Sequence, residues 1–406
     1  MTATTARRLT ARRAAAAALA VAALITGAAP VAAAAPAPAP APAGTAAAPP
    51  AAGPGAHRAT REALDAAVAA GAPGAVAGAV RGHRAWHGTA GAADLDTGKP
   101  RTPRDRFRVG SITKTFVATV LLQLEAEGRI DLDESVGSRL PGLVEGNGHD
   151  GSRVTIRQLL NHTSGIADYT ADPDFGERVF GSGFPEHRYD TWTPRSLVQT
   201  AMKHAPDFPP GTAWGYSNTN YILAGLVIEE VTGRPYGREI ERRILRPLHL
   251  RATSVPGTSA AMPRPSGRAY STLGAAPSPD RDLHDVTELN PSIAWAAGEM
   301  ISDTRDLQRF YRALFSGRLL PEAQMAELTD TVEVSPQVPE ARYGLGVMWR
   351  RLDCGTEIWG HGGGIHGSLS QVAVTEEATH SVAVNLNGDF AGDTAAVVRA
   401  EFCGRR

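Results

Sequence analysis

Strand-like segments lie at both ends of the folded part of this chain, and a stretch rich in helical patterns separates them. Near the start, two short apolar stretches, 74–81 and 83–88, flank Gly82 and predict a hairpin. Near the end, four strands in meander order are predicted at 343–352, 357–361, 368–374 and 381–386. We expect both ends to contribute to one sheet. The predicted fold class is therefore α+β: an antiparallel sheet flanked by helices, with a mainly helical lobe inserted at 131–291.

Apolar residues at helical spacing predict the helices that pack on this sheet. They are expected at 61–70, 111–127, 218–231, 237–245, 303–315 and 394–402. Between 131 and 291, frequent proline and glycine residues interrupt the pattern, which indicates short helices. The chain has no repeat with the period of a solenoid.

The first 56 residues differ in composition from the rest of the chain. Four arginines precede an Ala/Leu/Val run and small residues follow it, so 1–35 is predicted to be a secretory signal peptide. The alternative is a retained membrane anchor, but the apolar run is short for a bilayer span. An Ala/Pro-rich linker is expected at 36–56 and one folded domain at 57–406. The protein is therefore expected to be secreted, with no stable membrane insertion after cleavage.

The charge balance argues against polyanionic partners. Loss of the signal peptide removes four positive charges and no negative ones, which takes the formal net charge from −1 to −5. The remaining chain shows no basic stripe, so binding to nucleic acid or to anionic membranes is not expected. The twelve histidines are scattered and form no His-Glu-x-x-His motif, so neither a metal nor another cofactor is expected.

The only two cysteines, Cys354 and Cys403, both lie in the part of the chain predicted to be exported. We predict a disulfide between them, since exported proteins meet an oxidising environment. Closing this loop would stabilise the fold by roughly 4 kcal/mol in the chain-entropy model. The alternative is a pair of free thiols.

Only three of the 41 basic residues are lysine, and one of them, Lys114, follows Ser111 by three positions. Arginine stays protonated in proteins, whereas a buried lysine can lose its proton and accept one from a hydroxyl. We interpret Ser111 as a nucleophile and Lys114 as its activating partner. The Ser111 N–H would lie at the start of a helix, where it could hold an oxyanion. The alternative is a helix-capping serine followed by a surface lysine.

Two further segments could complete such a site. Tyr216 precedes an apolar helix, and its hydroxyl could relay protons if a nearby cation lowers its pKa, while Asn218 offers an amide to a substrate. His361 could supply a polar or cationic group, and it begins a glycine run in which Gly363 and Gly364 permit another backbone to approach. The Gly364 N–H is a candidate oxyanion donor. A capping loop and a glycine-rich turn are the alternative interpretations.

The His-Gly-Gly-Gly sequence is also typical of α/β-hydrolase esterases. That fold requires a Gly-x-Ser-x-Gly elbow, which this chain does not contain. The α/β-hydrolase interpretation is therefore rejected.

Three motifs, Ser111-Ile-Thr-Lys114, Tyr216-Ser-Asn218 and His361-Gly-Gly363, have the order and separation found in class C β-lactamase-like serine hydrolases. The chain resembles this family, which includes penicillin-binding D-alanyl-D-alanine carboxypeptidases, over about 59–404. Leu159-Leu-Asn-His-Thr-Ser-Gly165 and Tyr343-Gly-Leu-Gly346 extend the resemblance. The secreted carboxypeptidases of the family similarly carry one cysteine before the third motif and another near the end.

The resemblance implies that Ser111 forms an acyl-enzyme, that Lys114 and Tyr216 move its proton, and that Ser111 and Gly364 supply the oxyanion N–H groups. It implies a D-alanyl-D-alanine carboxypeptidase or related D-peptidase that β-lactams acylate. The expected partner is a cell-wall peptide or a β-lactam, and the expected state is a monomer. The alternatives are an esterase or β-lactamase on the same scaffold, or a non-catalytic module that binds cell wall or β-lactam. For 162–165 we expect a structural turn.

The chain departs from the carboxypeptidase pattern where that family binds the free carboxylate of its substrate. Met348 stands at the position of a strand arginine, and Gly362 and Gly364 stand at the positions of two threonines. Arg350 lies two residues further along, hence on the same side of a strand, and is the candidate substitute. His361 could add positive charge. This weakened clamp brings esters and D-amino-acid amides into consideration as substrates.

Overall fold

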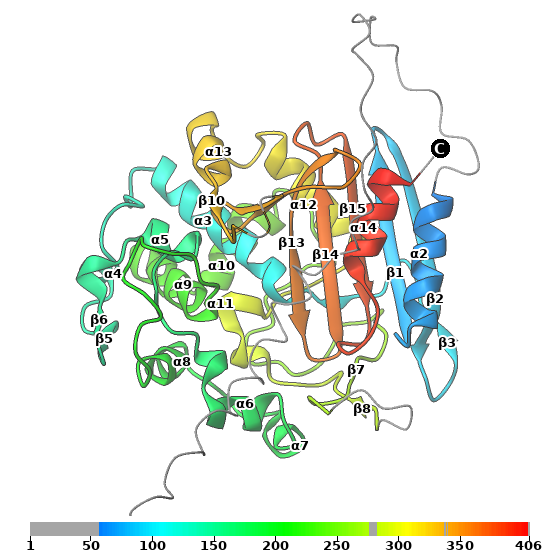
Figure 1. The fold of residues 1–406 in the computed structure, drawn as a ribbon, viewed down its shortest axis with the longest axis horizontal. Coiled ribbons are helices and arrows are strands. Elements are labelled where there is room, and N and C mark those ends of the chain that lie inside the picture. The colour runs from blue at the N-terminus through cyan, green and yellow to red at the C-terminus, as the bar shows by residue number, and fades with distance from the viewer. Residues whose placement is uncertain (1–56, 276–281, 337, 339, 405–406) are drawn as a thin grey trace, which may run out of the picture.

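One antiparallel sheet joins the two ends of the folded chain (Figure 1). The computed structural model describes residues 57–275, 282–336, 338 and 340–404, so the predicted signal peptide and linker lie outside the described residues. The strand order is β10-β11-β12-β13-β14-β15-β1-β2-β3. Strands β15 and β1 pair from Ala75 with Leu386 to Arg81 with His380, which places the N-terminal hairpin beside the C-terminal meander. The predicted α+β fold with split sheet segments is confirmed.

The strands of this sheet follow the predicted segments closely at most of their ends. In sheet order they are β10 Val332–Glu333, β11 Ala341–Tyr343, β12 Met348–Arg351, β13 Glu357–Ile365, β14 Ser368–Val374, β15 His380–Leu386, β1 Gly74–Arg81, β2 Arg84–Asp94 and β3 Lys99–Pro100. Short two-stranded pairs are formed by β4 Phe107–Arg108 with β9 Ile301–Ser302, β5 Glu145–Gly146 with β6 His149–Asp150, and β7 Tyr270–Ser271 with β8 His284–Asp285.

Three predicted strand ends are wrong. Strand β2 does not end at position 88 but continues to Asp94. The segment 343–352 is broken by a turn in which the Gly344 N–H donates to Val347 O at 2.8 Å and Gly346 has φ +74°, so β12 begins at Met348. Strand β13 does not end at His361 but continues through the glycines to Ile365. The glycines therefore belong to the sheet.

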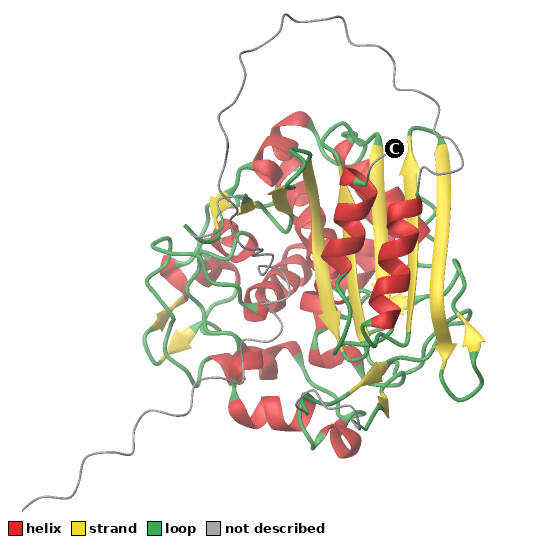
Figure 2. Cartoon of the chain, turned by 45° about the vertical axis from the view of Figure 1, so that its right-hand side comes forward, coloured by secondary structure: helices red, strands yellow, loops and turns green. Residues whose placement is uncertain are grey.

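Helices α2 Arg58–Ala69 and α14 Thr394–Cys403 lie side by side on one face of the sheet (Figure 2). Apolar residues of both helices pack against alternate residues of β1 and β15. This cluster includes Leu64, Ala67, Val397 and Val398 from the helices and Ala75, Ala77, Ala79, Val382 and Val384 from the strands. Because successive strand residues point to opposite faces, Val76 packs into the larger core on the other side.

The larger core lies between the other face of the sheet and the helical lobe. Its helices are α3 Thr113–Ala126, α4 Val136–Arg139, α5 Ile156–Leu160, α6 Pro173–Val179, α7 Phe184–His187, α8 Pro194–Ala201, α9 Asn218–Thr232, α10 Tyr236–Ile240, α11 Trp295–Gly298, α12 Thr304–Phe315 and α13 Glu322–Thr329. Most helices within 131–291 are short, as predicted, and α10 continues as a π-helix over Glu241–Leu245. Among the described helices, none is both long and apolar enough to cross a membrane.

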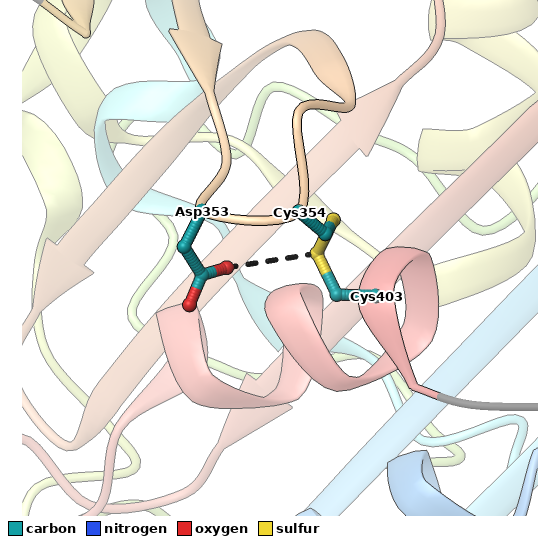
Figure 3. A group of neighbouring side chains, drawn as sticks. All are labelled: Asp353, Cys354 and Cys403. Atoms are coloured by element: carbon teal, nitrogen blue, oxygen red, sulfur yellow. Dashed lines mark hydrogen bonds between the residues drawn. A yellow bond between two sulfur atoms is a disulfide. The ribbon is translucent and has the colours of Figure 1, made fainter. Parts of the chain in front are cut away.

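Cys354 and Cys403 form the predicted disulfide, with Cα atoms 5.6 Å apart (Figure 3). The bond ties the loop between β12 and β13 to the last residue of α14. Asp353 Oδ1 lies 3.7 Å from Cys403 Sγ, so three potential metal ligands are close together. Both sulfur atoms are in the disulfide, however, and neither is a thiolate that could bind a metal.

Glu401 in α14 is a buried carboxylate that fastens the two outer helices to the sheet. Its Oε2 accepts hydrogen bonds from Thr60 Oγ1 at 2.7 Å and lies 2.9 Å from His57 Nδ1. Its Oε1 lies 2.8 Å from His380 Nε2 in β15. Burial opposes ionisation of Glu401, but the hydrogen bonds from His380, His57 and Thr60 outweigh it and lower its pKa.

Replacing this carboxylate should weaken the fold in a pH-dependent way. A lowered pKa means that ionised Glu401 stabilises the native state above the unfolded-state pKa of about 4.3, and that this contribution is lost as the pH falls through the folded-state pKa. We expect Glu401→Gln to reduce the free energy of unfolding at pH 7 by about 1–3 kcal/mol, measured by denaturant titration.

The difference between Glu401→Gln and the parent should shrink in acid. Glu62→Gln is the matched control, since Glu62 is an exposed residue of α2 in a surface pair with Arg58 and should change stability little. This role would be contradicted if both variants lost the same free energy of unfolding, or if the loss in Glu401→Gln did not change with pH.

Candidate active site

Ser111 lies in a 3₁₀ turn, Gly110–Ile112, that leads directly into α3. Strand β13 passes very close to this turn. A Cβ placed on Gly110 would lie 2.8 Å from the Gly364 nitrogen, and one on Gly363 would lie 1.9 Å from Val109 O. Gly110 also has φ +55°, which favours glycine. The glycines therefore allow β13 to run against the backbone of the nucleophile turn.

Lys114 is fully buried one turn after Ser111. Its Nζ lies 3.1 Å from Ser111 Oγ, 2.8 Å from Asn218 Oδ1 and 2.7 Å from Ala297 O, so it joins α3, α9 and α11. Burial lowers the pKa of Lys114 to about 7, against an opposing effect of the Asp168 charge. The alternative of a surface lysine is thereby rejected.

These three contacts give a neutral Lys114 a defined orientation. A neutral amine has two hydrogens and one lone pair, and the oxygens of Asn218 and Ala297 can only accept hydrogen bonds. The two hydrogens therefore point to Asn218 and Ala297, and the lone pair faces Ser111. Ser111 Oγ is the one neighbour of the three that has a proton to give. The geometry thus fits proton transfer from Ser111 to Lys114.

Asp168 fixes the amide of Asn218 in the orientation that this arrangement needs. Asn218 Nδ2 donates to Asp168 Oδ2 at 2.9 Å, which leaves Oδ1 for Lys114. Asp168 is itself held by the Thr170 N–H, which donates to its Oδ1 at 3.1 Å. Burial raises the pKa of Asp168, while hydrogen bonds and the nearby Lys114 act in the opposite direction. Asp168 was not predicted as a site residue, because it lies about fifty positions from both Lys114 and Asn218 and belongs to no predicted motif.

Tyr216 lies in the segment that enters α9, beside Ser111 and Lys114. Lys114 Nζ is 4.9 Å from the centroid of its ring. Burial raises the pKa of the Tyr216 hydroxyl, and a hydrogen bond with Ser111 offsets part of the rise. The expectation that a cation lowers this pKa is wrong, because Lys114 is largely desolvated and not a permanent cation. Tyr216 therefore remains a neutral phenol at pH 7, able to donate a hydrogen bond or pass on a proton.

His361 is buried behind the site and carries no charge at neutral pH. Its Nε2 lies 2.8 Å from Tyr343 Oη and its Nδ1 lies 2.5 Å from Gly362 O. Burial lowers the pKa of His361 to about 3, and Lys114 lowers it further in the same direction. The expectation that His361 adds positive charge for a substrate carboxylate is wrong. It is a neutral polar group.

Arg350 does not reach the nucleophile. It pairs in register with Ile358, and Ile358 packs in the cluster that α2 and α14 cover. The charged groups that act on Arg350 are Asp393 and Arg399, at the start of α14 and within it. Arg350 therefore lies on the sheet face opposite to Ser111, and the predicted role as a substitute carboxylate ligand is wrong. Arg350 does lie on the same side of the strand as Met348, as predicted, but both residues face the outer helices.

His162 adjoins the site, although the sequence analysis gave its segment only a structural role. It is fully buried with φ +63°, and its ring centroid is 4.2 Å from that of Tyr216. Its Nδ1 accepts hydrogen bonds from the Ser217 N–H at 3.2 Å and Asn220 Nδ2 at 3.1 Å. The turn is structural, as expected, and it supports the ring of Tyr216.

The contact of Asp168 with Asn218 leads to a prediction about pH dependence. Asp168→Asn keeps an oxygen that can accept from Asn218 but removes the negative charge that raises the pKa of Lys114. Because a neutral Lys114 is the active form, hydrolysis should rise with pH through a midpoint near 7 in the parent. In the variant this midpoint should move to lower pH by roughly one unit, measured as kcat/KM against pH.

Asp150→Asn is the control, because Asp150 caps another 3₁₀ turn of the lobe in the same way, through the Ser152 N–H. Its midpoint should stay where it is in the parent. An unchanged midpoint in a folded Asp168→Asn protein would contradict the electrostatic role of Asp168.

Comparison with known proteins agrees with this geometry. A D-stereospecific amidohydrolase from Streptomyces sp. is similar in structure, with 62% identity, a TM-score of 0.82 and coverage of 86% of this chain and 99% of that one. A D-amino acid amidase from Ochrobactrum anthropi SV3, in complex with D-phenylalanine, has 31% identity, a TM-score of 0.73 and coverage of 86% and 99%.

Among curated proteins, Penicillin-binding protein 4 of Amycolatopsis lactamdurans is 26% identical over 74% of this chain and 77% of its own length. The chain spans 60% and 41% of the length of two further curated relatives that it matches. A family model described as Beta-lactamase matches residues 60–401, nearly the whole described chain. Ser111, Lys114 and Tyr216 lie in contact, and the family model matches most of the chain. The chain therefore belongs to the β-lactamase family of serine hydrolases.

Proposed function

We propose that this protein is a D-stereospecific amidohydrolase, which cleaves the amide bond of D-amino-acid amides or of peptides through an acyl-enzyme on Ser111. The observation that carries the proposal is the loss of both cations expected for a substrate carboxylate. Arg350 lies on the far face of the sheet, and His361 is neutral. A carboxypeptidase must bind the free carboxylate of its substrate, whereas an amidase acts beside an uncharged leaving group. The similarity to a D-stereospecific amidohydrolase and a D-amino acid amidase supports the same assignment.

The proposed acylation uses the contacts around Lys114. Neutral Lys114 accepts the Ser111 hydroxyl proton as Oγ attacks the carbonyl carbon, and the N–H groups of Ser111 and Gly364 hold the resulting oxyanion. Tyr216 gives its proton to the departing amine and regains one from protonated Lys114. Collapse of the tetrahedral intermediate breaks the C–N bond and leaves the acyl group on Ser111.

Deacylation reverses these proton movements. A water molecule loses a proton to neutral Lys114, directly or through the Tyr216 hydroxyl, and attacks the ester carbonyl, and Ser111 Oγ leaves with a proton returned by the same route. Burial holds the pKa of Lys114 near 7. This value serves both half-reactions, because the amine must accept a proton and then return it at the same pH.

A second candidate function is acylation by β-lactams. It is favoured by the similarity to Penicillin-binding protein 4 of Amycolatopsis lactamdurans. The same nucleophile would open a β-lactam ring, whose amide nitrogen stays attached to the acyl group. The predicted signal peptide supports a location outside the cell for either activity.

A substrate panel separates these functions. We expect purified protein to hydrolyse D-phenylalanine amide with a kcat/KM at least about a hundredfold above that for L-phenylalanine amide, measured by release of ammonia. The value should also exceed that for release of D-alanine from a peptide ending in D-Ala-D-Ala. Ser111→Ala should abolish each activity and any adduct with penicillin, seen by mass spectrometry.

Two outcomes would overturn the proposal. Faster cleavage of the D-Ala-D-Ala peptide than of the amide would assign the protein as a carboxypeptidase. A lasting penicillin adduct on Ser111 without turnover of any amide, p-nitrophenyl ester or nitrocefin would identify a binding protein.

A further inference from the structure

A groove rich in arginine lies away from Ser111, between α12 and the turns at the ends of the β1–β2 and β14–β15 hairpins. Its volume is about 610 Å³. Four arginines line it, Arg305, Arg309, Arg312 and Arg318, and one acidic residue, Glu377. The whole chain carries a formal net charge of −1, so this is a local concentration of positive charge. The expectation that the chain has no basic stripe is wrong at this place.

Two of the arginines are fixed by backbone carbonyl oxygens, and one of them, Arg312, holds the groove in shape. Arg312 donates from Nε to Ala378 O and from Nη2 to Gly82 O, both at 3.0 Å, and so joins α12 to the two hairpin turns. Arg309 Nη1 lies 3.3 Å from the carbonyl oxygens of Leu248 and His249. Carbonyl oxygens do not neutralise a guanidinium, so both arginines keep their full charge while their positions are fixed.

The other two arginines are open to a ligand. Arg305 and Arg318 are exposed, and within the described part of the chain neither has a carboxylate within 4.0 Å, although the charge of Arg305 acts on buried Asp303. Arg305, Arg309 and Arg312 are spaced by four and three residues, so they lie along one face of α12. At 1.5 Å per residue, this row extends for about 10 Å.

His87 and Gln308 line the groove near β1 and β2, and further polar groups lie behind them. A Cβ on Gly78 would lie 3.1 Å from both His87 Nδ1 and Thr304 Oγ1 and 2.6 Å from Gln308 Nε2, so three polar side chains meet over this glycine. His87 Nδ1 and Thr304 Oγ1 are buried and have no hydrogen-bond partner among the described residues. Both atoms are covered by their neighbours, so they lie behind the groove and not on its surface.

We propose that this groove binds a linear polyanion that carries phosphodiester groups, such as an anionic polymer outside the cell. Guanidinium groups recognise phosphate oxygens in a planar, bidentate manner, which favours phosphate over other anions. Three arginines in a row along α12, with Arg318 beside them, suit a chain of repeated charges better than one small ion. The site shares none of its lining residues with the catalytic site, so it would serve to hold the enzyme on a polymer.

The test is a binding titration with the full-length protein and a short poly(glycerol phosphate) chain, followed by calorimetry at several salt concentrations. The double variant Arg305→Ala/Arg318→Ala should weaken binding at low salt by at least about tenfold and reduce the dependence of log Kd on log salt by one to two. Arg195→Ala is the control, because Arg195 is an exposed arginine of α8 outside the groove. The Kd of the Arg195→Ala variant for the polymer should stay within about twofold of that of the parent.

Hydrolysis of the amide substrate should be equal in the parent and the double variant, which separates this proposal from the proposed function. Equal weakening by Arg195→Ala would show non-specific attraction and would overturn the proposal. Orthophosphate binding as tightly as the polymer would show a single-ion site, and tighter binding of a single-stranded oligonucleotide would assign the groove to nucleic acid. Either result would also overturn it.

Discussion

The site is organised by the burial of one amine. Lys114 brings together α3, α9 and α11 through contacts with Ser111, Asn218 and Ala297. Desolvation makes the charged form costly, and the acceptors around Nζ leave the lone pair of the neutral form directed at the nucleophile. The same burial keeps Tyr216 protonated and His361 neutral at pH 7, whereas Lys114, with a pKa of about 7, is neutral in about half of the molecules.

The fold supplies the site from two distant parts of the chain. The nucleophile turn precedes the helical lobe, and β13 follows it, and they touch because β1 and β15 pair in the centre of the sheet. On the outer face, the Cys354–Cys403 bond and the contacts of Glu401 fasten α14 at both its end and its side. The sheet that backs the catalytic face is thus held to α14 by a covalent bond and by buried hydrogen bonds.

Ser111, Lys114 and Tyr216 could be predicted because their chemistry is expressed in short motifs beside apolar helices. The position of Arg350 could not, since the turn at 344–347 and the pairing with Ile358 decide which face of the sheet it occupies. The charge of His361 depends on burial by residues far away in the sequence. Asp168 has no motif, and only the packing of the lobe brings it to Asn218.

Titration of Lys114 itself shows whether burial makes this amine a proton acceptor at neutral pH. With only three lysines in the chain, lysine labelled with ¹³C at Cε gives a simple spectrum, and Lys99→Arg and Lys203→Arg variants assign the Lys114 signal. Because burial lowers the pKa of Lys114, we expect this signal to titrate with a midpoint near pH 7. A midpoint near the ordinary lysine value of about 10.4 would contradict it, because the amine would then be charged and unable to take the serine proton.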